Sequence, residues 1–158
     1  MTRDVLVTIS GLQTDVVPRE DTEDEPIEVV TPASYFYKNG KHYLIYEEVT
    51  EGFPGVTKNK IKVTDANTIE ILKSGNVNTH MLFCKGKDSM TYYDTPYGKM
   101  LVGIHTTEVQ VEETENFIRI LIEYGLDVNH DPIADCEIRI TVQSKEVKEF
   151  PATETDWK

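Results

Sequence analysis

Turn-forming sequences recur along the chain at intervals of roughly ten residues, and the stretches between them alternate apolar and polar side chains. The strongest turn sequence is Asn39-Gly40, which separates an aromatic run at 35–37 from the apolar-rich stretch at 42–46. A two-residue type I′ turn requires positive φ at both central positions, and Asn and Gly tolerate this conformation best. The sequence therefore predicts a hairpin here and antiparallel neighbours along the rest of the chain.

The same pattern predicts nine or ten strands and no helix. A meander of this length twists, and closing it into a barrel removes the exposed edges. We expect an all-β, antiparallel up-and-down barrel of about 8–10 strands, with a two-sheet sandwich as the alternative. The strands are expected at 4–14, 27–38, 42–46, 57–63, 68–74 and 77–84, on both sides of the turn Thr95-Pro96-Tyr97-Gly98 within 89–111, at 116–128 and at 136–142.

One of these segments, 116–128, is compatible with two periodicities. Phe117, Ile120, Leu121 and Tyr124 would share one face of a helix. However, every second residue from Ile118 to Val128 is apolar, as in a half-buried strand. The Ile residues in that set favour the strand, because a branched Cβ restricts χ1 in a helix. We therefore predict a strand.

A chain of 158 residues fits one domain with a sizeable core. We assign residues 1–150 to a single barrel domain. Within it, 17–26 is strongly acidic and would repel itself, which predicts a mobile loop. The polar residues 151–158 are expected to form a frayed C-terminal tail.

The formal net charge is −12 at pH 7, from 28 acidic and 16 basic residues. Such a surface repels phosphate backbones and anionic lipids, so we expect no nucleic-acid or membrane partner. The densest basic stretch, 58–62, places its lysines on one face of a strand, as expected of a solvated outer face. The N-terminus lacks an apolar leader segment, and Cys84 and Cys136 lack Cys-x-x-Cys spacing, so we expect free thiols in the cytoplasm.

A set of short motifs carries a family resemblance over nearly the whole chain. They are Val7-x-Ile9-x-Gly11, Tyr43-x-x-Tyr46-Glu47-Glu48, Ser74-Gly75-x-Val77-x-x-x-Met81-x-Phe83, Tyr93-x-Thr95-Pro96-Tyr97-Gly98 and Gly103-Ile104-x-Thr106. On these residues the chain resembles the YwiB-like proteins, small bacterial domains of unknown function. The resemblance implies a calycin-like (lipocalin-like) β-barrel in the bacterial cytoplasm, and it carries over no catalytic residue. The chain departs from true lipocalins: their first-strand Gly-x-Trp is absent, and the single Trp, Trp157, lies in the tail.

Motifs for catalysis, cofactors or metals fail on their spacing. Asp127-x-Asn129-x-Asp131 begins like a calcium loop, but Pro132 and Ile138 stand where that loop requires Gly and Glu. The four His residues share no metal-ligand spacing. Cys84 follows apolar residues, which favours a packed thiol over a nucleophile. We therefore predict no catalytic residue, no metal and no cofactor, and an enzyme is the least supported class.

Arg119 is the most suggestive single residue for ligand binding. It lies in a strongly apolar strand, on the parity of Phe117 and Leu121. If it points inward, its guanidinium requires a partner such as Glu47, Glu48 or a bound anion; if it points outward, it is a solvated charge. Tyrosines suit the mouth of a barrel because they pack and hydrogen-bond at once, although they suit core packing equally well. The candidate ligand-binding residues are Arg119, Tyr46, Tyr92, Tyr93, Tyr97 and His80.

Two function classes follow from this fold. The first is a barrel that binds a small molecule in or at its mouth, because an eight-stranded barrel either holds one small ligand or is filled by side chains. The second is a protein-interaction module with a filled core, acting through an acidic loop or an exposed strand. Internal volume separates the two, because small-molecule sites measure about 300 Å³ or more. The oligomeric state is left open by the sequence.

Overall fold

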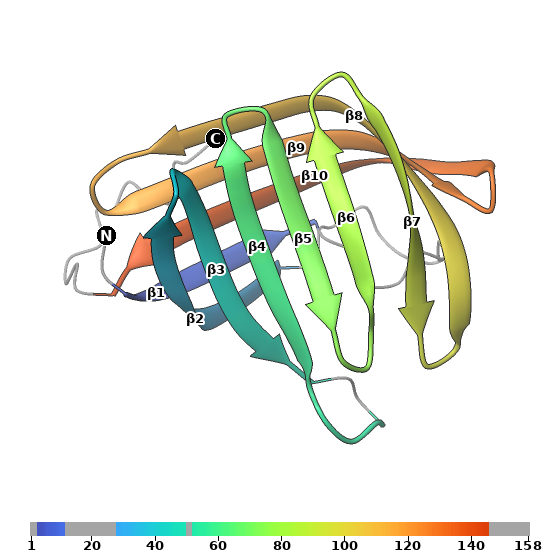
Figure 1. Ribbon diagram of the computed structural model, residues 1–158, viewed down its shortest axis with the longest axis horizontal. Helices are drawn as coiled ribbons and strands as arrows, with labels where there is room; N and C mark the ends of the chain where they lie inside the picture. Colours follow the sequence, from blue (N-terminus) through green and yellow to red (C-terminus); the bar gives the residue numbers. More distant parts are fainter. Residues whose placement is uncertain (1–2, 12–27, 50–51, 146–158) are drawn as a thin grey trace.

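A computed structural model of the protein describes residues 3–11, 28–49 and 52–145. Within these ranges it contains ten strands and no helix (Figure 1). The acidic loop expected at 17–26 and the tail expected at 151–158 lie outside the described residues. The strands are β1 Asp4–Ser10, β2 Glu28–Lys38, β3 Lys41–Glu48, β4 Thr57–Asp65, β5 Thr68–Ser74, β6 Thr79–Cys84, β7 Asp88–Thr95, β8 Gly98–Glu113, β9 Phe117–Val128 and β10 Asp131–Ser144.

All ten strands belong to one antiparallel sheet, in the order β6-β5-β4-β3-β2-β1-β10-β9-β8-β7. The first and last strands pair in its middle, where Val7 lies opposite Val142. The sheet curls so that β3 to β6 lie in front of β8 to β10 and cross them steeply (Figure 1). The antiparallel up-and-down barrel predicted from the turns and the alternation is thus confirmed.

The barrel is nearly closed, and its seam lies between the two edge strands, β6 and β7. Asn78 and Asp94 form an isolated bridge there, with backbone hydrogen bonds of 2.8 and 2.9 Å. Farther along the seam, the Thr79 hydroxyl donates a hydrogen bond to the carbonyl of Tyr92 at 2.9 Å. This link uses a side chain, whereas the other neighbouring strands are joined by ladders of backbone hydrogen bonds. The seam is the weakest hydrogen-bonded line in the described sheet.

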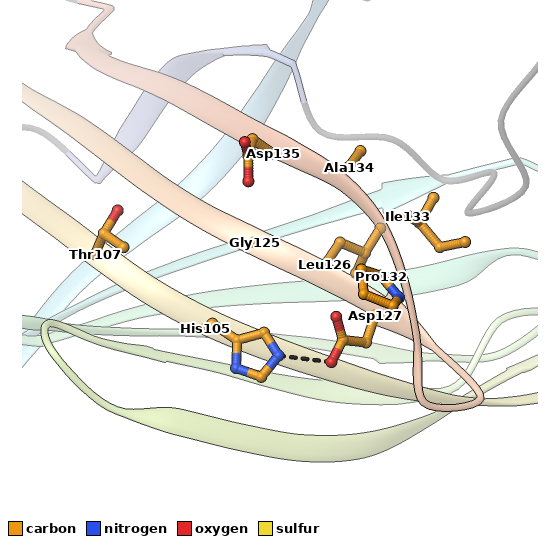
Figure 2. A pocket seen from close by; sticks show the side chains of 9 residues that line it. All are labelled: His105, Thr107, Gly125, Leu126, Asp127, Pro132, Ile133, Ala134 and Asp135. Carbon is orange, nitrogen blue, oxygen red and sulfur yellow. Dashed lines mark hydrogen bonds and ion pairs between the residues drawn. The ribbon is translucent and has the colours of Figure 1, made fainter.

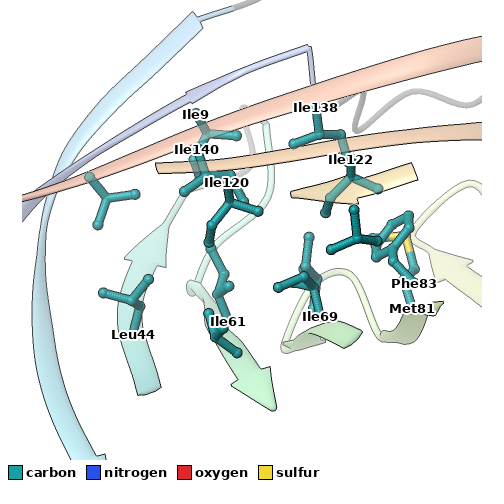
Figure 3. Close-up of a cluster of buried hydrophobic side chains, with 14 of the residues drawn as sticks. Ile9, Leu44, Ile61, Ile69, Met81, Phe83, Ile120, Ile122, Ile138 and Ile140 are labelled. Atoms are coloured by element: carbon teal, nitrogen blue, oxygen red, sulfur yellow. The ribbon is translucent and has the colours of Figure 1, made fainter. Parts of the chain in front are cut away.

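Side chains fill the interior of the barrel. Alternation along each strand sends every second residue inward, and branched aliphatic residues dominate because they fit a pleated surface. Figure 3 shows side chains from opposite walls, among them Ile61 and Ile69 from the front and Ile120 and Ile140 from the back, meeting in one cluster. All four are at most 1% exposed. Their burial supplies the main hydrophobic stabilisation of the fold.

Local predictions hold at the segments that most tested them. The 116–128 segment is strand β9, and its burial alternates as the every-second-residue pattern predicts. Asn39 and Gly40 both have positive φ, 56° and 77°, as a type I′ turn requires. β1 ends at Ser10, and residues 12–14 of the expected first strand lie outside the described residues. Gly11 follows with φ 92°, and a Cβ there would collide with the carbonyl oxygen of Glu137, so this close backbone approach requires glycine.

Candidate functional site

A groove of about 490 Å³ lies on the outer surface of the barrel, across β8, β9 and β10 (Figure 2). One wall is apolar and comes from the start of β10, where Pro132, Ile133 and Ala134 follow one another. The pairing of β10 with β9 shifts register between Pro132 and Ala134, so this segment bulges away from the sheet. The opposite side carries His105 and Asp127.

His105 is held between two carboxylates. Its Nε2 lies 2.7 Å from Asp127 Oδ2 on β9, and its Nδ1 lies 3.0 Å from Asp88 Oδ1 on β7. The hydrogen bond to Asp127 and, as the next largest effect, the hydrogen bond to Asp88 raise the pKa of His105 above its ordinary value, because both stabilise the imidazolium. Both ring nitrogens are engaged with carboxylates, so neither is free to act as a general base.

Gly125 forms the floor beside His105, and the side chain of Asp127 covers Gly103. Gly103 lies opposite Asp127 on β9, and Gly125 lies opposite His105. A Cβ at Gly125 would stand 3.7 Å from a carboxylate oxygen of Asp135 and 3.8 Å from the Cβ of His105. Because Gly125 lines the groove and has no side chain, the sheet backbone is open to an occupant at this position.

A second polar cluster lies inside the barrel, at the mouth where β3 ends and β4 begins. The Lys73 side chain is only 2% exposed, and its Nζ lies 2.8 Å from Glu48 Oε1. The same ammonium donates to Asn59 Oδ1 at 2.6 Å, and Asn59 Nδ2 donates to Glu48 Oε1 at 2.9 Å. The three side chains form a closed ring of hydrogen bonds, which compensates for burying the lysine.

Tyr46 lies next to this cluster, two residues before Glu48 on the same face of β3. The side chain is 7% exposed. Burial and, to a lesser extent, the Glu48 carboxylate raise the pKa of Tyr46, so its phenol stays protonated and can donate a hydrogen bond. The mouth thus offers a phenol, a carboxylate, an amide and an ammonium within one small region.

The six predicted ligand-binding residues do not converge on one site. Tyr46 and Tyr93 point into the barrel, and Tyr93 is 1% exposed as part of the core. Tyr92 and Tyr97 are 58% and 84% exposed, and the Tyr97 ring meets Phe53 edge-on. Neighbouring residues alternate in direction along a strand, which separates Tyr92 from Tyr93.

His80 points outward as well, and its Nε2 pairs with Glu70 Oε1 at 2.7 Å. His42 points inward, where its Nδ1 lies 2.8 Å from the Tyr35 hydroxyl and its Nε2 lies 3.1 Å from Glu113. The two histidines therefore bind different partners on opposite faces of the sheet. His80 therefore forms no common site with the candidate tyrosines.

Arg119 lies on the outer face of β9, together with Phe117 and Leu121, because the alternating residues Ile118 and Ile120 point inward. Its guanidinium covers the Phe117 ring at 4.7 Å and its Nη1 lies 3.6 Å from Glu112 Oε1. The partners proposed for an inward arginine, Glu47 and Glu48, are not in this contact. Arg119 is thus a surface ion pair and cation–π residue.

Replacing Arg119 with Leu is expected to lower the free energy of unfolding by less than about 1 kcal/mol, because exposed ion pairs and cation–π contacts are individually weak. Urea denaturation at low salt measures the change. A loss above about 2 kcal/mol would show that the arginine contributes to the core in a way that its outward position does not explain.

Sequence reasoning missed the residues that form both polar sites. Asp88 and His105 are cross-strand partners in the β7–β8 hairpin, and the register of that turn was the available signal. For the polar cluster at the mouth, the available sequence signal was a polar residue at the end of a strand, at a position where the alternation predicts an inward side chain. Lys73 continues the inward series of Ile69 and Ile71 on β5.

The sequence matches a family model described as a domain of unknown function (DUF1934) over residues 11–140. The chain belongs to this family. The uncharacterized β-barrel protein YwiB of Bacillus subtilis (strain 168) is 29% identical over 115 residues, which cover 73% of this chain and 79% of YwiB. A crystal structure of the ywiB protein from Bacillus subtilis matches with a TM-score of 0.73 at 25% identity, covering 90% of this chain and 92% of that chain. The resemblance to the YwiB-like proteins is confirmed.

The thiols and the potential metal ligands of the described residues form no further candidate site. Cys84 and Cys136 are both free thiols. No three His, Cys, Asp or Glu side chains in the described ranges are grouped as a metal ion would need. Within the same ranges, no helix has the length and apolarity to cross a membrane.

Proposed function

We propose that this protein is a recognition module, in which the filled barrel is a rigid scaffold and the outer face of β7 to β10 contacts a partner protein. One observation carries the proposal: side chains pack the interior, whereas the groove of about 490 Å³ lies outside, across β8 to β10. An open groove on the outside of a sheet suits an extended segment or a protruding side chain of another protein.

Exposed apolar side chains beside the groove support this face as an interface. Met90 and Tyr92 on β7 are 55% and 58% exposed. Met90 is the cross-strand partner of Gly103, which in turn lies opposite the groove residue Asp127, and Tyr92 is the partner of Leu101. Tyr and Met are enriched in the cores of protein–protein interfaces. The apolar patch and the charged groove together form one continuous surface.

A small polar molecule at the barrel mouth is the second candidate function, and the specific observation in its favour is the cluster of Tyr46, Glu48, Asn59 and Lys73. Native mass spectrometry of protein purified from its own host separates the two candidates. A stoichiometric small adduct that disappears in Tyr46→Phe supports the mouth, whereas a clean mass for the isolated chain supports the recognition module.

We propose the cytoplasm as the place of action. Both thiols are free, Cys84 and Cys136, as is typical of proteins in a reducing compartment. A lipocalin-like ligand carrier is less well supported, because the core side chains occupy the volume that a carrier reserves for its ligand.

Photo-crosslinking in the native host tests the recognition module. Benzoylphenylalanine is placed at Tyr92 and, as a matched control, at Tyr37 on β2, which is 61% exposed against 58% for Tyr92. We expect an adduct of defined mass from position 92 and none from position 37. The adduct should disappear when Gly125→Val fills the groove floor. Identical adducts from both positions, or none from position 92, would overturn the proposal.

A further inference from the structure

We propose that the outer groove docks a basic segment of a partner protein, whose Lys or Arg side chain takes over the carboxylates that His105 now holds. This inference rests on the proposed function and names the chemistry of its partner. The occupant is recognised by the negative charge of the groove and by its apolar wall.

The charge of the groove comes from three strands. Asp88 on β7 and Asp127 on β9 hold His105, and Asp135 on β10 stands on the far side of Gly125. Asp127 and Asp135 line the groove, and Asp88 holds His105 from β7, so three carboxylates surround a single cationic group. Lys85, in the turn before β7, is already paired with Glu108 at 2.9 Å and supplies no charge to the groove. The unbalanced negative charge selects a cationic occupant.

The shape of the groove fits the rest of a basic side chain. Pro132, Ile133 and Ala134 offer an apolar wall, against which the methylene stem of Lys or Arg packs while its charged head reaches the carboxylates. The glycine floor at Gly125 lets the partner approach the sheet closely. A second copy of this chain is disfavoured, because its own net charge is −12.

His105 makes docking sensitive to pH. The two aspartates raise the pKa of His105, so the imidazole stays protonated above its ordinary range and occupies the same carboxylates as the incoming cation. As the pH rises through the raised pKa, the imidazolium loses its charge and Asp88 and Asp127 become free to bind a basic partner. Docking therefore strengthens with rising pH, as long as the partner itself remains protonated.

Fluorescence polarisation with a fluorescein-labelled hexalysine peptide tests this at pH 6 and pH 9, at constant low ionic strength. We expect roughly fivefold tighter binding at pH 9, which is the effect of one unit charge close to the site in water. In His105→Gln the two affinities should become equal. His80→Gln is the matched control, because His80 also pairs with a carboxylate outside the groove, and it should leave the pH effect intact. A pH effect that survives in His105→Gln would overturn the proposal that His105 competes with the basic partner for Asp88 and Asp127.

Two further variants localise the probe. Gly125→Val fills the floor without changing any charge, and Asp135→Asn removes one carboxylate; each should weaken hexalysine binding several-fold. Glu115→Gln removes the same charge from an exposed position outside the groove and should leave binding within a factor of two. Equal binding to all variants, with the Tyr92 crosslink intact, would refute the basic partner and spare the recognition module. Loss of the Tyr92 crosslink as well would refute both.

Discussion

Replacing Gly75 with Ala is expected to lower the free energy of unfolding by about 3–4 kcal/mol. Gly75 lies in the β5–β6 turn with φ 143°, a conformation that side chains rarely adopt. A Cβ there would collide with the carbonyl oxygen of Val56 and lie 2.8 Å from the Cα of Thr57. Both atoms are backbone at the start of β4, so the strand itself must move. Guanidinium denaturation measures the loss.

Gly98 provides the matched control in the Thr95–Gly98 turn. Its φ is 139°, close to that of Gly75, but nothing lies within 4 Å of the position of its Cβ. Gly98→Ala should therefore cost only the conformational strain, about 1–2 kcal/mol. Because the two substitutions share the same strain, their difference isolates the backbone collision. Equal losses would show that the β4 backbone yields without cost.

Replacing Glu48 with Ala is expected to lower the free energy of unfolding by about 2–3 kcal/mol. The change leaves the Lys73 ammonium, 2% exposed, without its counter-charge, and it leaves Asn59 Nδ2 with only the longer hydrogen bond to the Thr57 carbonyl, at 3.4 Å. The carboxylate itself is 36% exposed, so solvent screening places the loss at the lower end for a broken buried pair. Urea denaturation at two salt concentrations measures the effect.

Glu47→Ala is the control for this change, because Glu47 is the adjacent residue and points to solvent. It should shift stability by less than about 0.5 kcal/mol. Adding Lys73→Met to Glu48→Ala should restore at least about 1 kcal/mol, since an apolar side chain then fills the space of the unpaired ammonium. A double variant less stable than Glu48→Ala alone would contradict the view that the buried charge is the cost.

The fold could be predicted because its determinants are local. Asn39-Gly40 sets a hairpin by itself, and the alternation from Ile118 to Val128 selects strand over helix within one segment. The direction of Arg119 follows from the same alternation, because Ile118 and Ile120 on either side are buried. Such features need no knowledge of which strands become neighbours.

The candidate site could not be predicted to the same degree, because it depends on the register of several strands. The pairing of Thr95 with Gly98 at the β7–β8 turn places Asp88 opposite His105, and this step was within reach of the sequence. Placing Asp127 next to His105 also requires the register between β8 and β9, which includes a shift between Thr106 and Glu108. Local patterns do not reveal where such a shift occurs.

The pairing of β1 with β10 also has a consequence for biosynthesis. Val5, Val7 and Ile9 are buried in the strand that pairs with β10, Asp131–Ser144, which is the last of the ten described strands to be synthesised. Until that strand emerges, β1 has one unpaired edge and the growing sheet keeps its apolar face open to solvent. Closure therefore waits until the last of the ten described strands has been synthesised.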